Sequence, residues 1–361
     1  QNDTVLVHPG RLPGCCRLPC GESGSTLRLL LPVVAALGIH AGFFMEGRLP
    51  SRPLAPLGRE LEAHGVRLSR PEPGFLQCRG KLEPGSFRLP GNVSSQFISG
   101  LLFALPLLDR ESTLTVTGPV ESGPYLKMTL AALELFGIHP TVRGAAYFLS
   151  PASYRSPGQV HVEGDWSNAS YLVAAGALGR QEVHVTGLSA TSLQGDRALL
   201  DILSRMGASL KPCDGGVSVT PAPLHGITAD MSACPDLVPT IAAVAAFADG
   251  PTTITNVAHL RIKESDRLRA PARALARIGV SVDEHDDGLT IHGLGSQARI
   301  RIGDTVFEGC NDHRMVMSEA LFSLRSDDVR PDGIRAHIDT PGAVNKSFPE
   351  FWHTWESFFE D

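Results

Sequence analysis

A repeat of about 70 residues constrains the fold of this chain more than any other feature. Four helix-like segments, "ELEAHGV", "LELFGI", "ILSRMGA" and "LARIGV", end in a glycine followed by an aliphatic or small residue. The glycines are 72, 70 and 72 residues apart: Gly65, Gly137, Gly207 and Gly279. Glycine is favoured just beyond a helix C-terminus because that position needs a positive φ. We therefore expect each glycine to end a helix before a strand.

A second series of motifs marks the helix starts. Polar turns precede small-residue or apolar segments in "ESGSTLRLLL", "NVSSQFISGLLFAL", "DWSNASYLVAAGAL", "CPDLVPTIAAVAAF" and "NDHRMVMSEALF". The steps between them are 71, 73, 68 and 77 residues, with these markers: Gly24, Ser95, Asn168, Asp236 and His313. Ser, Asp and Asn in such turns are good N-caps. The two series predict a unit of strand, helix, strand, helix and further strands.

Each predicted unit has a second polar turn, in "PSRPLAP", "ESGPYLK", "SLQGDRA" and "KESDRLR". The last overlaps "IKESDR" (262–267), which holds four charged residues and follows "TTITNVAHL", a stretch with the pattern of a strand. Helix N-termini favour anions, since their N–H groups are free and the helix dipole is positive there. If the repeats pack around an axis, these corners converge and line an anion-binding cleft.

Composition narrows the classes of function. The 361 residues suffice for two domains, with 42% hydrophobic and 19% charged residues. A net charge of −6 argues against a nucleic-acid binder but permits small anionic ligands. The longest apolar run (29–39) is too short to span a bilayer, and no signal peptide is visible, so we expect a cytoplasmic protein without a membrane partner. Seven irregularly spaced cysteines favour free thiols, and Cys15, Cys16 and Cys20 lack a fourth zinc ligand.

The motifs together resemble the 5-enolpyruvylshikimate-3-phosphate (EPSP) synthase family. The resemblance runs from about residue 4 to the C-terminus, in order, through "CGESGSTLRLL", "RPLAPL", "NVSSQF", "SGPYLKMT", "EGDWSNASYLVAAGAL", "SLQGD", "DMSACPDLVPTIAAVAAFADG", "LRIKESDRL", "NDHRMVM" and "NKSFPEFW". It implies an α/β fold of two inside-out domains built from βαβαββ repeats, here residues 1–160 and 161–361. Substrates are expected to bind between the domains, which close on them.

The resemblance also implies a reaction. The enolpyruvyl group of phosphoenolpyruvate passes to the 5-hydroxyl of shikimate 3-phosphate and phosphate is released, on the shikimate pathway to chorismate and aromatic amino acids. No cofactor or metal is expected, and a monomer is the expected state.

Substrate-binding residues are carried over position by position. For phosphoenolpyruvate they are Gly24, Ser25, Arg52, Gln96, Arg267, Arg314 and Lys346. For shikimate 3-phosphate they are Ser94, Ser95, Gln96, Ser122, Tyr125, Asp236, His259 and Lys263. Arginine and lysine suit these substrates because both carry phosphate.

Three positions near these residues need separate treatment. Glu22 stands where an asparagine is usual in the family, so we expect it to pair with a nearby arginine. His259 also occupies a position that is often asparagine. Arg28 is open between a substrate contact and a structural pairing, and we place it at the site.

Four residues are expected to carry the chemistry. Asp236 would orient and deprotonate the attacking hydroxyl, while Lys263 reaches the substrate ring. Glu264 would give a proton to the methylene carbon and recover it later. His313 is a phosphate donor or a secondary proton carrier, whereas Asp266 is expected to cap a helix or pair with an arginine.

A count of the corners departs from the family pattern. Five helix-start corners are present, whereas two domains of three repeats each need six. We therefore expect a partial chain. Its first domain should expose apolar surface, and its activity should be impaired. One alternative is the UDP-N-acetylglucosamine enolpyruvyl transferase, which "RPLAPL", "SSQ" and "KESDR" disfavour. Another is a homologue that binds the substrates without turnover.

Overall fold

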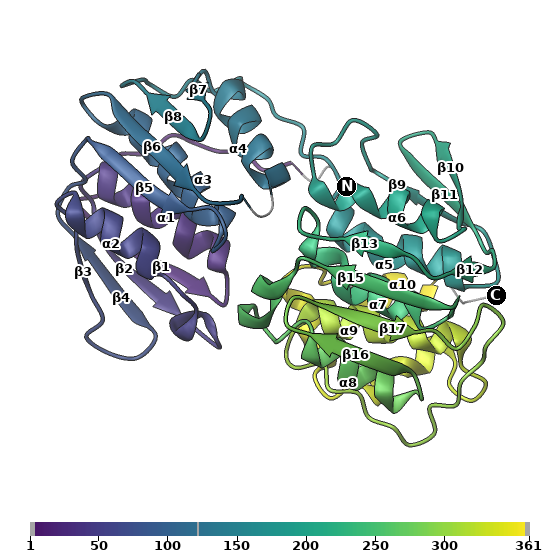
Figure 1. The fold of residues 1–361 in the computed structure, drawn as a ribbon. Coiled ribbons are helices and arrows are strands. Elements are labelled where there is room, and N and C mark those ends of the chain that lie inside the picture. The colour runs from purple at the N-terminus through teal and green to yellow at the C-terminus, as the bar shows by residue number, and fades with distance from the viewer. Residues whose placement is uncertain (1–3, 121–122, 358–361) are drawn as a thin grey trace. The chain divides into compact units, whose positions relative to one another are not determined.

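A computed structural model describes residues 4–120 and 123–357, which form two compact units (Figure 1). Among the described residues, unit 1 comprises 4–120 and 129–157, and unit 2 comprises 123–128 and 158–357. Tyr125 therefore belongs with unit 2, which the sequence pattern did not indicate. The predicted domain boundary near residue 160 stays a prediction.

Unit 1 contains two copies of one pattern of strands and helices. The first is β1 (Cys15–Gly21), α1 (Gly24–Ala36), β2 (His40–Met45), α2 (Ala55–Ala63), β3 (Arg67–Ser69) and β4 (Phe75–Arg79). The second is β5 (Ser86–Pro90), α3 (Ser95–Ala104), β6 (Ser112–Thr117), α4 (Gly123–Leu135), β7 (Thr141–Arg143) and β8 (Ala146–Leu149). Within α4, residues 129–135 belong to unit 1 and residues 123–128 to unit 2. Their sheets have equivalent orders, β1-β2-β4-β3 and β5-β6-β8-β7. In both, the first pair is parallel and the other pairs are antiparallel.

Unit 2 repeats the pattern with variations. Its first part has α5 (Trp166–Leu178), β9 (Val183–Thr186), α6 (Leu199–Arg205), β10 (Ser209–Cys213) and β11 (Gly216–Thr220). Next come β13 (Thr228–Asp230), α7 (Val238–Ala245), β15 (Pro251–Thr255), α8 (Arg269–Arg277), β16 (Ser281–His285) and β17 (Gly288–His292). The order β13-β15-β17-β16 matches both sheets of unit 1, which confirms the predicted repeat.

The rest of unit 2 is less regular. A short parallel pair joins β12 (Leu224–His225) to β14 (Ala248–Asp249). The last part has α9 (His313–Ala320) and α10 (Phe351–Ser357), with isolated parallel bridges from Ile300 to Ser326 and from Phe307 to Ile338.

The four predicted helix-ending glycines share one geometry. Their φ angles are +90°, +78°, +98° and +84° for Gly65, Gly137, Gly207 and Gly279. Each donates its N–H to a carbonyl of the last helical turn, and the next residue donates to a carbonyl one residue earlier, as for Gly65 to Glu62 and Val66 to Leu61. This is the Schellman arrangement, which satisfies carbonyls that would otherwise lack partners. The expectation that glycine ends these helices is confirmed.

The helix starts vary more. Side chains of Ser23, Asp165 and Asp312 accept N–H bonds in the first turns of α1, α5 and α9. Ser94 precedes α3 without a side-chain cap, and α7 follows the short 3-10 helix η4 (Pro235–Leu237). The prediction that "TTITNVAHL" is a strand throughout was wrong, because β15 ends at Thr255 and the 3-10 helix η5 (Ala258–Ile262) follows. Asn256 at φ +62° makes that turn.

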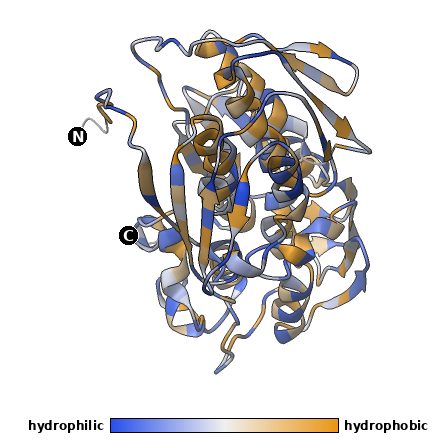
Figure 2. Ribbon diagram, turned by 90° about the vertical axis from the view of Figure 1, so that its left-hand side faces the viewer, coloured by the Kyte–Doolittle hydropathy of each residue, from blue (hydrophilic) through white to orange (hydrophobic). Residues whose placement is uncertain are grey.

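Helices form the interior of each unit. All eight residues of α7 and eleven of the thirteen in α5 are buried, whereas strands such as β2 alternate between buried and more exposed positions. Figure 2 shows the same contrast, with hydrophobic residues gathered on the helices and mixed colours along the strands. The predicted arrangement of helices inside sheets is confirmed. Among the described residues, no helix has the length and apolar character needed to cross a bilayer.

Candidate active site

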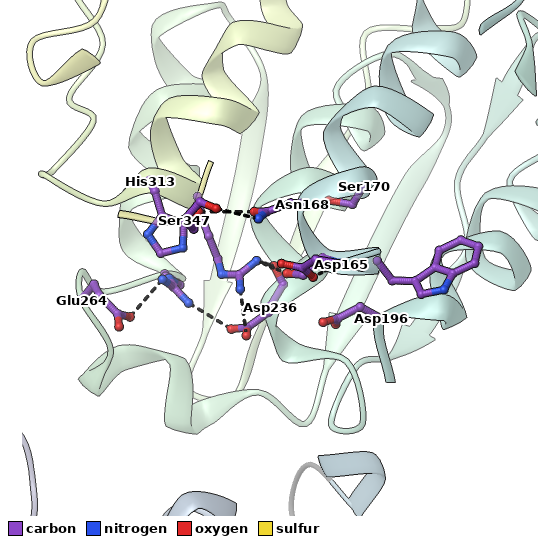
Figure 3. A network of polar contacts seen from close by, with 12 residues as sticks. Asp165, Asn168, Ser170, Asp196, Asp236, Glu264, His313 and Ser347 are labelled. Atoms are coloured by element: carbon purple, nitrogen blue, oxygen red, sulfur yellow. Dashed lines mark hydrogen bonds and ion pairs between the residues drawn. The ribbon is translucent and has the colours of Figure 1, made fainter. Parts of the chain in front are cut away.

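A buried ion cluster lies at the start of α9 in unit 2 (Figure 3). Asp312, fully buried, caps α9 and binds Arg267 through both oxygens, with Nε–Oδ2 and Nη2–Oδ1 distances of 2.8 and 3.0 Å. The Ser265 hydroxyl also donates to Asp312, at 2.7 Å. Burial alone would raise the pKa of Asp312, but the Arg267 guanidinium holds it well below its usual range. Asp312 is therefore a permanent anion that fixes the position of Arg267.

Asp236 lies between two arginines. Its Oδ1 is 3.0 Å from Arg267 Nη1 and its Oδ2 is 3.0 Å from Arg314 Nη2. Burial opposes ionisation, but the charges of Arg314, Lys263 and Arg267 hold the pKa of Asp236 far below its usual range. The structure thus brings together three predicted residues, Asp236, Arg267 and Arg314.

The predicted proton donor joins the same cluster. Glu264 Oε2 lies 2.9 Å from Arg267 Nη2, so Arg267 links Glu264, Asp236 and Asp312. Its guanidinium is only 2% exposed, and it is held by carboxylates on three sides. The corner that carries it begins after η5 and ends where Asp266 Oδ1 accepts the N–H groups of Leu268 and Arg269.

Asp266 also lies 3.3 Å from Arg261, so its expected structural role is confirmed. The charges of "IKESDR" therefore divide into a part that fixes the corner and a part that faces the cluster.

Both predicted histidines are neutral near pH 7. Burial and the Arg314 charge lower the pKa of His313 to about 4. Burial and Lys263 lower the pKa of His259 to about 4. A neutral imidazole can donate one hydrogen bond but adds no positive charge, which favours the hydrogen-bonding role of His313 over a cationic one.

The helix starts of unit 2 supply further polar groups. Arg314 Nη1 donates to the Ser167 hydroxyl in the first turn of α5. Asn168 and Ser347 exchange two hydrogen bonds, of 3.0 and 3.3 Å. Lys346 donates to the Asn311 carbonyl at 2.5 Å. Arg314 and Lys346 were predicted site residues, whereas Ser167 and Asn168 were not. The structure places these two beside them.

Two residues of the cluster were absent from the predicted set although their motifs were recognised. Asp312 belongs to "NDHRMVM" and Asp196 to "SLQGD". Tyr125, which was predicted, lies between Asp196 and Asp236, with its hydroxyl 3.3 and 3.4 Å from their carboxyl oxygens. The available signal was an aspartate at a recurring helix-start corner.

Unit 1 holds a second set of predicted residues. Gln96 accepts a bond from Arg28 Nη1 at 2.9 Å and donates to the Ser25 hydroxyl at 2.8 Å. Arg28 is buried and also donates to the Pro53 carbonyl at 3.3 Å. A Cβ added at Gly24 would lie 3.1 Å from Arg52 Nη1, so glycine leaves room for that guanidinium. The structure brings all five of these site residues together.

For the remaining predicted site residues near the start of the chain, the structure tests some expectations and leaves others open. Ser94 and Ser95 lie at the start of α3, beside Gln96. The carboxyl group of Glu22 packs against Gly47, and its expected pairing with an arginine stays a prediction. Ser122 lies outside the described residues.

The described residues contain no group of three or more His, Cys, Asp or Glu side chains placed to hold a metal ion. The seven cysteines are free thiols, with Cys20, Cys78 and Cys234 buried. The cationic clusters are instead suited to anionic ligands.

Solved structures define the class. EPSP synthase from Acinetobacter baumannii matches with a TM-score of 0.73 at 24% identity, covering 92% of this chain and 76% of that one. The enolpyruvyl transferase NikO from Streptomyces tendae matches with a TM-score of 0.71 at 17% identity, covering 93% and 76%. These likenesses establish the fold alone, and the protein has the enolpyruvyl transferase fold.

Sequence comparison gives the family. The family model of EPSP synthase (3-phosphoshikimate 1-carboxyvinyltransferase) matches residues 1–355. The 3-phosphoshikimate 1-carboxyvinyltransferase of Clostridium novyi (strain NT) is 37% identical over 341 residues, or 94% of this chain and 76% of the relative. That of Idiomarina loihiensis is 38% identical over 367 residues, or 98% and 83%. The chain therefore belongs to the EPSP synthase family, and the predicted resemblance is confirmed. Both relatives carry the name of the shikimate enzyme, which favours it over the UDP-amino sugar alternative.

Proposed function

We propose that this protein transfers the enolpyruvyl group of phosphoenolpyruvate to the 5-hydroxyl of shikimate 3-phosphate and releases phosphate. The family membership supports the reaction. The observation that carries it is the cluster in which Arg267 and Arg314 flank Asp236 while Glu264 binds Arg267. It combines cations that suit phosphate with two carboxyl groups that suit proton transfer.

Each unit contributes a different set of binding groups. In unit 1, Gly24, Ser25, Arg52 and Gln96 bind phosphoenolpyruvate, and the hydrogen bonds of Gln96 to Arg28 and Ser25 hold this set in place. Arg28 therefore acts at least as a support for Gln96. Ser94 and Ser95 bind shikimate 3-phosphate at the start of α3, where the free N–H groups favour phosphate.

Unit 2 supplies Arg267, Arg314 and Lys346 for phosphoenolpyruvate, and Tyr125, Asp236, His259 and Lys263 for shikimate 3-phosphate. Bound anions would compete with Asp236 for the arginines. Asp312 keeps Arg267 in place during that competition, because its two hydrogen bonds approach from another side. Ser122 completes the proposed set for shikimate 3-phosphate.

The chemistry divides between two carboxyl groups. Asp236 orients the 5-hydroxyl and receives its proton, while Glu264 gives a proton to the methylene carbon and recovers it as phosphate leaves. His313 donates a hydrogen bond as a neutral imidazole. Interactions of this kind accelerate the reaction only if they strengthen in the transition state.

The test is phosphate release from phosphoenolpyruvate with and without shikimate 3-phosphate. Release that needs both substrates is the expected result, and Arg267→Lys should reduce it at least about 100-fold because lysine cannot make the bidentate contact. Arg273→Lys is the matched control, since Arg273 lies on α8 with 59% of its side chain exposed. Tight binding of both substrates without release would instead favour the non-catalytic homologue.

The family resemblance also motivates a proposal on the state of the protein. We propose that it acts as a monomer in the cytoplasm. Light scattering during gel filtration tests the first part, and a dimer at micromolar concentration would contradict it.

A further inference from the structure

The hydroxyl of Tyr125 connects a buried carboxyl group, that of Asp196, to the half-buried carboxyl group of Asp236 in unit 2. It lies 3.3 Å from Asp196 Oδ2 and 3.4 Å from Asp236 Oδ2. Asp196 is 3% exposed, and its second oxygen, Oδ1, is buried with no hydrogen-bond partner. A buried oxygen without a hydrogen-bond partner lowers the stability of the folded protein, so its presence points to a functional role for Asp196.

The corner that carries Asp196 is built to approach this site. Asp196 lies in the 3-10 helix η3 (Gly195–Ala198), in the motif "SLQGD". A Cβ at Gly195 would lie 2.4 Å from the Ala233 carbonyl and 3.1 Å from Pro124. Only glycine therefore lets η3 pack this closely beside Tyr125 and the turn that carries Asp236.

The two carboxyl groups differ sharply in basicity. Arg267 and Arg314 hold Asp236 ionised, which makes it a weak base. Burial and the Asp236 charge raise the pKa of Asp196 to about 7. Burial and both carboxylates keep Tyr125 neutral, because they raise the pKa of its hydroxyl well above the usual value. The charged or titratable groups that face Asp196 are Tyr125, Asp165, Cys234, Asp236 and Arg314.

We propose that Tyr125 and Asp196 form a proton relay, which removes from Asp236 the proton it takes from the attacking hydroxyl. The relay rests on the proposed function. Asp196 acts through Tyr125 and Asp236, and it is a positioning residue because it does not contact the reacting atoms.

The proton transfers balance within the residues and substrates already named. The 5-hydroxyl O–H bond breaks, its electron pair forms the bond to carbon 2 of phosphoenolpyruvate, and the proton moves to Asp236. The electron pair of the carbon 2–carbon 3 double bond takes the proton that Glu264 gives to the methylene carbon, so carbon 3 becomes a methyl group. Asp236 then passes a proton to the Tyr125 oxygen while Tyr125 gives its own proton to Asp196 Oδ2. When phosphate leaves with the electron pair of its bond to carbon 2, Glu264 recovers a proton from the methyl carbon and that C–H electron pair re-forms the double bond. The proton held by the relay returns by the same route to the departing phosphate.

The first measurement is the pH profile of kcat in the wild-type protein, with both substrates saturating. Asp196 must be ionised to receive the proton, so kcat should fall as pH decreases through about 7. Asp196→Asn removes the proton acceptor and keeps the shape of the side chain. It should lower kcat by about 100-fold, as loss of a proton-transfer group does, and abolish the decline near pH 7.

Non-additivity is the second measurement. Tyr125→Phe should lower kcat as much as Asp196→Asn, and the double variant should be no worse than either, because all three interrupt one relay. The KM for shikimate 3-phosphate is followed separately, since the Tyr125 hydroxyl also binds that substrate. Asp196→Glu should restore part of the activity and the decline at low pH. Asp249→Asn, which alters an exposed aspartate in β14, is the matched control and should retain the wild-type profile.

The outcomes separate the relay from the reaction. An active wild type, whose decline near pH 7 persists in Asp196→Asn, would overturn the relay alone. Effects of the two single variants that multiply in the double variant would also overturn it. A wild type without substrate-dependent phosphate release would refute the proposed function and the relay together. Circular dichroism and equilibrium binding of shikimate 3-phosphate verify that each variant is folded.

Discussion

The helix C-termini and the helix N-termini of this repeat protein differ in how much they vary. Four C-termini close on Gly65, Gly137, Gly207 and Gly279 with the same pair of hydrogen bonds. The N-termini use a serine cap, an aspartate cap or a 3-10 turn, and they carry most of the proposed site. The comparison indicates that one end of the repeat maintains the fold, while the other is open to chemistry because its free N–H groups accept many polar partners.

The largest expected effect is at a helix-start corner. Arg267→Met should leave Asp236, Asp312 and Glu264 without their shared cation, which costs about 3–5 kcal/mol of stability when a buried pair is broken. It should also abolish phosphate release. Urea unfolding measures the first effect, and Arg273→Met, at an exposed site, should shift stability by less than about 0.5 kcal/mol. Equal shifts for both variants would show that the cluster contributes little to folding.

The two ends of α9 should respond to pH in opposite ways. Asp312 at its start is held ionised, whereas burial and nearby carboxylates raise the pKa of Glu319 well above its usual value near its end. Glu319 is 1% exposed and binds more protons folded than unfolded, so its contribution to stability falls as pH rises above its unfolded pKa.

Glu319→Gln should therefore gain stability relative to the wild type as pH rises above the unfolded pKa of Glu319 and stays below its folded pKa. The gain should approach about 1.4 kcal/mol per pH unit. Thermal unfolding at several pH values measures the difference, and a constant difference would contradict a neutral Glu319. Glu350→Gln, at an exposed position, serves as the control.

The helix-ending glycines should affect stability without affecting turnover. Gly207→Ala forces alanine to φ +98° and places its Cβ 3.0 Å from the Pro223 carbonyl, so we expect a loss of about 2–3 kcal/mol. Gly279→Ala, at φ +84° with open space around the Cβ, should lose about 1–2 kcal/mol. Urea unfolding gives the free energy of unfolding of each variant and so ranks the two. The kcat of each folded variant should equal that of the wild type. A lowered kcat in a folded variant would contradict the conclusion that the helix C-termini maintain the fold and only the N-termini carry the chemistry.

The smallest expected effect separates two caps. Asp165→Ala removes a side-chain bond to the Ser167 N–H and should cost about 1 kcal/mol. Ser94→Ala should change stability by only a few tenths of a kcal/mol, because Ser94 makes no cap bond. Thermal unfolding distinguishes them, and an equal loss would mean that Ser94 supports α3 in another way.

The sequence pattern predicted the repeat and its helix-ending glycines because both depend on local conformation. Glycine at a fixed spacing signals positive φ wherever it recurs. The pattern did not predict which carboxylate binds which arginine. Asp312 and Asp196 were recognised within motifs but not placed at the site, since their roles depend on burial and on partners 45 and 71 residues away. Similarly, the turn at Ala258 replaces a strand because Asn256 takes a positive φ, which the apolar spacing does not signal.

The contact between α1 and α3 in unit 1 bears on how mutational data for this protein should be interpreted. A Cβ at Gly100 would lie 2.3 Å from the Arg28 carbonyl oxygen, so the backbone of α3 touches the backbone of α1 there. Any side chain at Gly100 must push away the segment that holds Arg28, and with it Gln96 and Ser25. A survey of random variants scored only by growth would then assign Gly100 to the substrate pocket, although Gly100 lies at the contact between two helices and outside the proposed set of binding residues. Distance from the ligand is thus a poor guide to sensitivity where two helices meet without side chains between them.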